Sequence, residues 1–402
     1  MTVRSTNHDR ALAWSAKDGI VAPGKRVERK GAARRMLVAI LAVIAVGVGI
    51  ASLSIGGSRA NAQRAALAAA NPQTLARTDS MTFLQRYLAP DGRVVRHDQG
   101  GDTVSEGQAY AMLLAVATGQ AGPFAEAWRW TQANLQHPDG LFSFHWSNGA
   151  VVDPQPASDA DLDTAWALIL AGQRFANPTY VTDGKAVAAA ILANETINVA
   201  GNLELAAGPW AVTGPVVANP SYLAPEAMAA LATATGDPRW SALATSTTAL
   251  MTGLTGTSPV RLLPDWVELL PDGTAQPVGG PTGAGTPAYA LNAERAPVWL
   301  AASCRAADRS VAARDWTVLQ PAAHHGADIA YTLSGQPDSG VVNPVGLVAA
   351  AASAQAAGHV QDATSLLGQA DQQSQQSPTY YGDAWVALGR VLLDTNWVSP
   401  CP

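Results

Sequence analysis

The chain has few charged residues and only two cysteines, and both shortages exclude classes of protein. Of 402 residues, 14% are charged, while 48% are hydrophobic and 12 are tryptophan. This composition excludes a disordered chain and suffices for a sizeable core. Cys304 and Cys401 are too few for a disulfide-stapled scaffold and lack the close spacing of a zinc ribbon. The seven histidines form no HExxH motif, so the sequence offers no metal site of that kind.

Basic residues are scarce outside the N-terminal 35 residues. That leader contains nine Lys or Arg and three Asp or Glu, although the whole chain has a net charge of -6. The remaining residues are therefore strongly acidic. This charge balance argues against nucleic acid as a partner of the main body.

An uncharged run of 20 residues, 36–55, follows the basic leader. This length is about what one bilayer crossing needs, and the positive-inside rule keeps the leader, residues 1–35, in the cytoplasm. We predict a membrane anchor at 36–55 and export of the remaining chain. A signal peptide cleaved after Ala62 and a buried core helix are the alternatives. In an exported chain, a disulfide between the two cysteines could persist.

Residues 56–78 are rich in Ala, Ser and Gln and are predicted to form a linker, whereas residues 79–402 are predicted to form one domain. About twelve apolar segments of helical length alternate there with polar loops, which predicts an all-α fold of helical hairpins. An open solenoid and a closed toroid of six hairpins both fit, but no fixed-period repeat supports the solenoid. The segments are 106–119, 123–135, 159–174, 183–194, 222–235, 238–253, 288–303, 344–357, 359–372 and 380–393, with weaker ones at 309–320 and 322–333.

Three long loops, residues 136–158, 195–220 and 254–287, interrupt the helical pattern. Long loops on a rigid scaffold usually carry function. Aromatic residues lie on these loops or at helix starts. Core packing explains any single one of them, but several exposed together would form stacking platforms for the apolar faces of sugar rings. They are Phe142, Phe144, Trp146, Trp210, Tyr222 and Trp266.

Acidic residues gather at the starts of predicted helices. Glu106 begins one helix, and Asp159, Asp161 and Asp163 begin another. Helix capping accounts for one acid at each start, but three neighbouring acids repel, which raises at least one pKa and suits acid–base chemistry. Arg295, at a third start, would need a carboxylate partner if buried. Acids and aromatics in one cleft suit glycoside hydrolysis, in which one acid protonates the leaving oxygen and a second carboxylate activates water.

Five segments, in the same order, resemble glycoside hydrolase family 8, and in particular the endoglucanases encoded with bacterial cellulose synthases. The resemblance implies an (α/α)6 toroid and an inverting endo-hydrolase of β-1,4-linked polysaccharide that needs no cofactor. Cellulose-like glucan is the first expectation for the substrate, with mixed-linkage glucan, chitosan and xylan as alternatives. The segments are TVSEGQAYAMLLAV (103–116), ASDADLDTAWALILAGQRF (157–175), NPSYLAPEA (219–227), LLPDWV (262–267) and PTYYGDAWVALG (378–389).

The resemblance also implies roles for single residues. Glu106 falls on the general acid, and Asp159 on the aspartate that binds the sugar at the cleavage point or helps to place the water, with Asp161 as its partner. Asn292 stands where the cellulase branch has its general base, and an amide cannot accept a proton at neutral pH. Another acid must then be the base, and we favour Asp161. The candidates are Asp161, Asp153, Glu204, Asp265 and Glu294.

Substrate contacts are expected from residues near these acids: Asn292, Arg295, Trp146, Phe144, Tyr222, Trp266 and Asp265. The loss of the usual base leaves a second hypothesis open, a non-catalytic glycan-binding protein of the same fold. A third, a helical scaffold for protein partners, predicts exposed apolar helix faces. The resemblance further suggests an association with polysaccharide synthesis machinery.

Overall fold

The computed structural model describes residues 71–256, 262–399 and 401. The predicted leader and anchor, residues 1–35 and 36–55, lie outside this part of the chain. Among the helices within it, none combines the length and the apolar character that a bilayer crossing requires.

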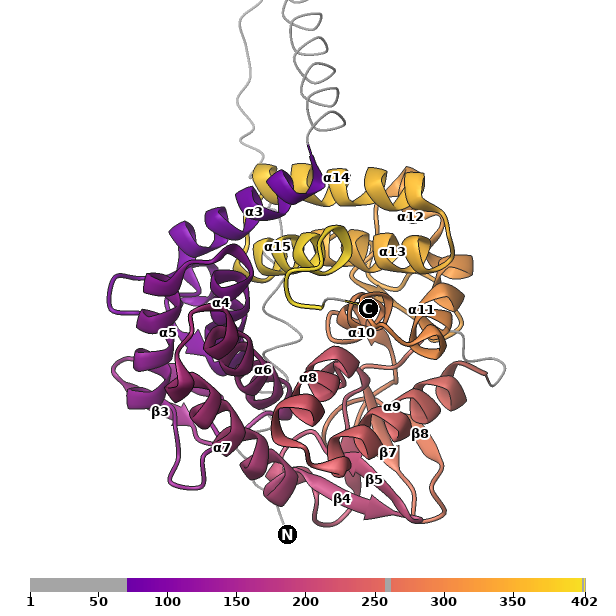
Figure 1. The fold of residues 1–402 in the computed structure, drawn as a ribbon. Helices are drawn as coiled ribbons and strands as arrows, with labels where there is room; N and C mark the ends of the chain where they lie inside the picture. The colour runs from indigo at the N-terminus through magenta and orange to yellow at the C-terminus, as the bar shows by residue number, and fades with distance from the viewer. Residues whose placement is uncertain (1–70, 257–261, 400, 402) are drawn as a thin grey trace, which may run out of the picture.

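The described helices form two concentric layers around a ring (Figure 1). Each inner helix contacts the next one, and the last contacts the first, so the ring is closed. The inner helices are α4 (Ser105–Thr118), α6 (Ser158–Arg174), α8 (Pro225–Thr235), α10 (Ala296–Ala301), α13 (Pro344–Ala356) and α15 (Tyr380–Asp394). The outer helices are α3 (Pro72–Tyr87), α5 (Ala121–Asn134), α7 (Pro178–Asn194), α9 (Pro238–Gly256), α11 (Ala306–Leu319) and α14 (Val360–Gln376). This closed arrangement agrees with the predicted toroid of helical hairpins.

The amino-acid pattern separates the two layers. Every residue of α4 is buried, which suits a helix that is apolar on all sides. The outer helix α14 instead buries one face, which includes Leu366, Leu367 and Ala370. A one-sided apolar stripe therefore places a helix in the outer layer, with its polar face toward water.

The first described helix, α3, closes the ring against the last helix, α15. The side chain of Asn71 caps α3 by accepting a hydrogen bond from the Gln73 amide at 2.9 Å, and Pro72 occupies the first turn. Phe83 on the same helix is fully buried. Residues 72–78, predicted to belong to the linker, are therefore part of the folded domain.

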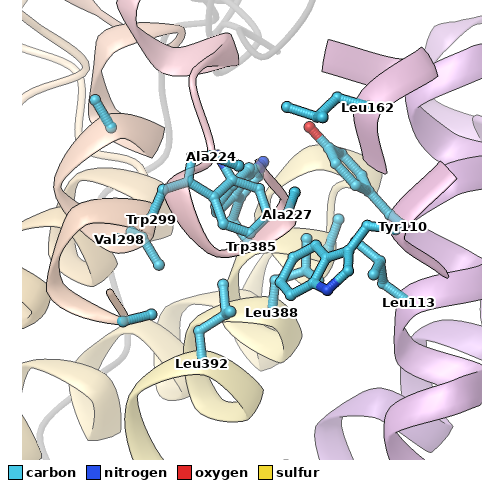
Figure 2. Packing of buried hydrophobic residues seen from close by; sticks show 14 of the residues in the cluster. Tyr110, Leu113, Leu162, Ala224, Ala227, Val298, Trp299, Trp385, Leu388 and Leu392 are labelled. Carbon is cyan, nitrogen blue, oxygen red and sulfur yellow. The ribbon is translucent and has the colours of Figure 1, made fainter. Parts of the chain in front are cut away.

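Large side chains fill the centre of the ring (Figure 2). The ring of Trp385 on α15 packs edge-on against Tyr110 on α4 and Trp299 on α10, with centroid separations of 5.6 and 5.3 Å. These contacts join three inner helices that are far apart in sequence. The interior is therefore a packed core, and any substrate must bind at an end of the ring.

Four small antiparallel sheets in the described residues correct the all-α expectation. They fold the loops that precede five of the inner helices, α4, α6, α8, α10 and α13. Because each inner helix is joined to the next through an antiparallel outer helix, the inner helices begin at the same end of the ring. The strands are β1 (Thr103–Val104), β2 (His145–Ser147), β3 (Ala150–Asp153), β4 (Thr196–Val199), β5 (Asn202–Leu205), β6 (Val216–Ala218), β7 (Trp266–Leu269), β8 (Ala275–Val278), β9 (Tyr289–Ala290) and β10 (Ala330–Tyr331). The predicted helix at 322–333 is only α12 (Ala322–His325), followed by β10.

Candidate active site

Arg295 lies at the centre of the end where the inner helices begin. It closes a short 3-10 turn, Ala293–Arg295, just before α10, and is 1% exposed. A single nitrogen, Nη1, donates to Oε1 of Glu106 at 2.5 Å and to Oδ2 of Asp159 at 2.9 Å. The expectation that a buried Arg295 would need a carboxylate partner is therefore confirmed.

Glu106 and Asp159 reach Arg295 from the first turns of α4 and α6. Helix N-termini favour negative charge, so this position stabilises both carboxylates. The loop around β2 fixes the start of α4, because the Ser105 amide donates to the carbonyl oxygen of Phe144 at 2.9 Å. One turn later, the Tyr110 hydroxyl donates to Oε1 of Glu106 at 3.1 Å.

The carboxyl groups of Glu106 and Asp159 lie close together. Because a single nitrogen contacts both, their oxygens are closer together than the separation of about 6.5–9.5 Å that an inverting acid and base require. Burial, followed by the charge of Glu106, raises the pKa of Asp159 well above its usual value, and Arg295 lowers it. Burial thus favours the protonated form of Asp159, which also lies too close to Glu106 to be the base opposite it.

The other end of the guanidinium holds two polar side chains. Nη2 donates to Oγ of Ser221 at 2.7 Å and to Oδ1 of Asn292 at 3.1 Å. The guanidinium carbon also lies 5.2 Å from the ring centroid of Tyr222, a cation–π contact. Arg295 thus links the acid pair to the position where the sequence has Asn292 in place of an acid.

Asp265, in the loop before β7, lies beside Asn292. Its Oδ1 accepts from the backbone amides of Ala290 and Ala293 at 3.0 and 2.8 Å. Burial raises the pKa of Asp265 to about 6, and these two hydrogen bonds, the charge of Arg295 and the Asn292 side chain oppose the rise. A carboxyl of this kind is mostly ionised at neutral pH.

A family profile of the glycosyl hydrolases family 8 matches residues 57–392. The chain belongs to this family. A probable endoglucanase of Novacetimonas hansenii is 34% identical over 54% of this chain and 64% of its own length, and an endoglucanase of Cellulomonas uda is 31% identical over 51% and 59%. These alignments thus span less than two thirds of either relative. The endo-β-1,4-glucanase CMCax of Acetobacter xylinum superposes with a TM-score of 0.68 at 26% identity, over 80% of this chain and 98% of that one.

Asp161, the family 8 residue that we favoured as the base, faces away from Glu106. It is fully buried, its Oδ1 accepts from the Phe142 amide at 2.9 Å, and its carboxyl group meets that of Glu195. Burial raises the pKa of Asp161 well above its usual value. The position inside the protein does not support the predicted role in activating water.

The structure also places the remaining candidate bases. Glu294 is fully buried, and its Oε1 would lie 2.8 Å from a Cβ at Gly346, so it faces the protein interior. Glu204 lines a cavity of about 390 Å³ between α9 and the β4–β5 hairpin. Asp153, at the end of β3, accepts from the Gln155 amide at 3.0 Å. Neither Glu294 nor Glu204 hydrogen-bonds to Arg295, Glu106 or Asp159 in the part of the chain that the structure describes.

Three predicted aromatic platforms form a run that leads away from Arg295. Tyr222 packs against Trp266 with a centroid separation of 5.9 Å, and Trp266 lies 6.5 Å from Trp210. Trp210 is half-buried and lines a cavity of about 240 Å³ together with Glu268. Tyr222 and Trp266 are only 6% and 5% exposed, so they are core residues rather than the exposed platforms that we predicted. Trp210 offers the accessible ring surface of the three.

The other predicted aromatics lie near the start of α4. Trp146 is half-buried on β2, where it packs against Trp130 at 5.4 Å and beneath the guanidinium of Arg93 at 4.8 Å. Phe144 is 5% exposed and Phe142 is fully buried. Phe142 is therefore a core residue, and Trp146 offers the more accessible surface for a sugar.

Sequence reasoning missed three polar side chains that complete the family 8 site. Tyr110 and Ser221 hydrogen-bond directly to the Arg295–Glu106 group. The Tyr381 hydroxyl donates to the carbonyl oxygen of Leu291 at 2.9 Å and so fixes the segment before Asn292. The spacing of Tyr110 four residues after Glu106 was a usable signal, because residues four apart share a helix face.

Proposed function

We propose that the protein is an inverting endo-acting glycoside hydrolase that cleaves β-1,4-linked glucan. The observation that carries this proposal is the contact of Glu106 and Asp159 with one guanidinium nitrogen, at the end of the ring where the functional loops gather. This arrangement holds an acid and a sugar-binding carboxylate at one point. The names of the relatives, which are endoglucanases, support a β-glucan as substrate.

Glu106 supplies the proton in this proposal. When the glycosidic bond breaks, the leaving oxygen takes a proton from Glu106, and Asp159 contacts the sugar ring at the cleavage point. Because both carboxyl groups contact Arg295, a sugar that reaches them must displace part of this contact. Arg295 and Tyr110 then hold the carboxylate that remains after transfer.

The half-buried rings of Trp210 and Trp146, on loops either side of the acid pair, support an extended polysaccharide as the substrate. Sugar rings present apolar C–H faces, which pack on aromatic rings. Cellulose-like glucan is the first choice, and mixed-linkage glucan, chitosan and xylan are the alternatives. Release of reducing ends by the exported domain, measured on soluble forms of all four, will identify the preferred backbone.

The second candidate is a glycan-binding protein without activity, which the presence of Asn292 favours. Reducing-end release by the wild type that disappears in Glu106→Gln supports the hydrolase. Binding without release, unchanged in Glu106→Gln, supports the binding protein instead.

We further propose that the domain lies outside the cytoplasm, tethered by residues 36–55 or released by cleavage after Ala62. The pairing of Cys304 with Cys401 supports this location, because disulfides persist in oxidising compartments. Association with polysaccharide synthesis machinery is part of the same proposal. Protease added to intact spheroplasts should degrade the domain, and a fully protected domain would contradict export.

A further inference from the structure

Asn292 removes the usual proton acceptor from the site but keeps contact with another carboxyl group. Its Oδ1 accepts from Nη2 of Arg295 at 3.1 Å, and its side chain also interacts with Asp265. The amide thus lies between the guanidinium that holds Glu106 and a carboxyl in the neighbouring loop. An inverting hydrolase needs such a second carboxyl.

Arg295 and the segment that contains Asn292 separate Glu106 from Asp265. Nη1 of Arg295 contacts Glu106, Nη2 contacts Asn292, and the amide of the next residue, Ala293, donates to Asp265. Glu106 and Asp265 therefore share no donor nitrogen, whereas Glu106 and Asp159 do. An inverting acid and base must be separated in this way, because a water molecule has to fit between them.

Backbone hydrogen bonds fix the position of the Asp265 carboxyl group, and the residue is partly exposed to solvent. Both backbone donors, from Ala290 and Ala293, reach its Oδ1, and the residue is half-buried rather than fully buried. Asp161 and Glu294 are both fully buried. A pKa of about 6 further suits a base that must be ionised near neutral pH.

We propose that Asp265 is the general base of this enzyme and that Asn292 is a positioning residue that orients the Asp265 carboxylate. This inference rests on the proposed hydrolase function. The water oxygen forms a bond to the anomeric carbon and gives its proton to Asp265. The glycosidic C–O bond breaks, its electron pair stays on the leaving oxygen, and that oxygen takes the proton of Glu106. The product has inverted configuration at the anomeric carbon.

The test compares variants on the preferred soluble glucan. In Asp265→Asn, the amide oxygen can still accept the two backbone hydrogen bonds, so the loop should keep its shape. We expect kcat to fall at least about 10²-fold while KM changes little. Asp272→Asn, which removes an exposed carboxylate from the turn between β7 and β8, is the matched control and should keep kcat within about threefold of the wild type.

A chemical rescue separates a base from a structural residue. Sodium azide needs no general base, so Asp265→Ala with azide should regain turnover and form an α-glycosyl azide. Asn292→Asp should not raise kcat, because a base is already present and a second carboxylate beside Asp265 would disturb its orientation. The inference is overturned if Asp265→Asn keeps more than a tenth of wild-type kcat, if folded Asp265→Ala forms no α-glycosyl azide, or if Asn292→Asp raises kcat more than tenfold. Each of these results leaves the hydrolase function intact, whereas an inactive wild type overturns both proposals.

Discussion

Arg295 allows two carboxyl groups to share a buried position where they would otherwise repel each other. Nη1 contacts both Glu106 and Asp159, while Nη2 holds Ser221 and Asn292. A planar guanidinium can make these contacts at once, whereas a lysine ammonium carries a single point of charge. The geometry of the two carboxyl groups therefore depends on Arg295.

Arg295→Lys should separate these roles without removing the positive charge. We expect kcat to fall at least about tenfold, because one ammonium cannot hold both carboxyl groups and Asn292 in the same geometry. The pH profile of kcat should also shift, since the pKa of Asp159 depends on Arg295. Steady-state kinetics from pH 5 to 8 will check this, and an unchanged profile would contradict the central role of the guanidinium.

Glu106→Gln should lower kcat by at least about 10²-fold, the usual scale for removing general acid catalysis. The amide can still fill the space and accept a hydrogen bond, but it cannot deliver a proton. Glu126→Gln on the outer helix α5 is the matched control and should behave like the wild type. Near-normal turnover of Glu106→Gln would remove this residue from the role.

At the residue scale, sequence spacing and resemblance predicted which acids gather but not where each one points. Glu106, Asp159 and Arg295 do meet. Asp159 and Asp161 are two residues apart on a helix start, so their side chains leave α6 in nearly opposite directions. The favoured base therefore faces Glu195 inside the protein. The contact between Asn292 and Asp265 joins segments 27 residues apart, and only the folded chain shows it.

At the scale of elements, loop segments pass close together to support the aromatic run. A Cβ at Gly208 would lie 2.5 Å from both the Pro156 carbonyl oxygen and the Trp210 indole nitrogen. That nitrogen donates to the same carbonyl oxygen at 2.9 Å, which fixes the ring beside the cavity. Gly208 thus allows the loop to hold the Trp210 ring in a fixed position.

Trp210→Ala should weaken the binding of long substrates more than of short ones. Loss of about 1 kcal/mol of aromatic packing corresponds to roughly a fivefold rise in KM. We expect this rise on polymer, with kcat unchanged on short oligosaccharides that do not reach Trp210. Trp397→Ala, at the opposite end of the ring, is the matched control. An equal effect of both substitutions would refute a distal role for Trp210.

Asp79 lies where α3 packs against α15, and its pKa is raised. Asp79 lies 3.4 Å from the guanidinium of Arg390, which also binds Asp394 at 3.0 Å. Burial raises the pKa of Asp79 to about 7, the charge of Asp371 adds to this, and Arg390 opposes it. The folded state therefore keeps a proton that the unfolded chain loses above about pH 4.

The stability that Asp79 contributes is fully present below about pH 4 and is lost as the pH rises toward 7. Asp79→Asn cannot ionise, so it should become more stable than the wild type by about 2–4 kcal/mol near pH 8, with a smaller difference near pH 5. Urea unfolding at both pH values measures this difference. Asp338→Asn, which removes an exposed carboxylate, is the control. A difference that does not change with pH would contradict the assigned proton.

At the element scale, helical periodicity predicted the long inner helices closely but failed where local sequence is ambiguous. The helix α3 has little one-sided apolar character and was assigned to a linker, although packing against α15 orders it. The segment 288–303 was predicted as one helix, yet β9 and a 3-10 turn occupy its first half. Contacts that form only in the closed ring decide both cases.

At the scale of the whole molecule, the candidate active site and the disulfide that holds the C-terminal segment lie at different ends of the ring. The acids lie where the inner helices begin, whereas α10 and α15 end near the disulfide between Cys304 and Cys401. The C-terminal segment is also held by Ser399, whose hydroxyl donates to Glu226 at 2.9 Å. The disulfide therefore joins the end of the chain to the part of the ring opposite the site.

This division predicts that the disulfide affects stability without affecting catalysis. It closes a loop with a sequence separation of 97 residues, and loops of this size correspond to about 4.7 kcal/mol in the chain-entropy account. Cys304→Ser should therefore lower Tm by several degrees, while kcat at 25 °C stays within about twofold of the wild type. Reductant should lower the Tm of the wild type to that of the variant and leave the variant unchanged. A variant that loses activity while still folded would show that the two ends of the ring are coupled, and an unchanged Tm would show that the tail contacts alone close the ring.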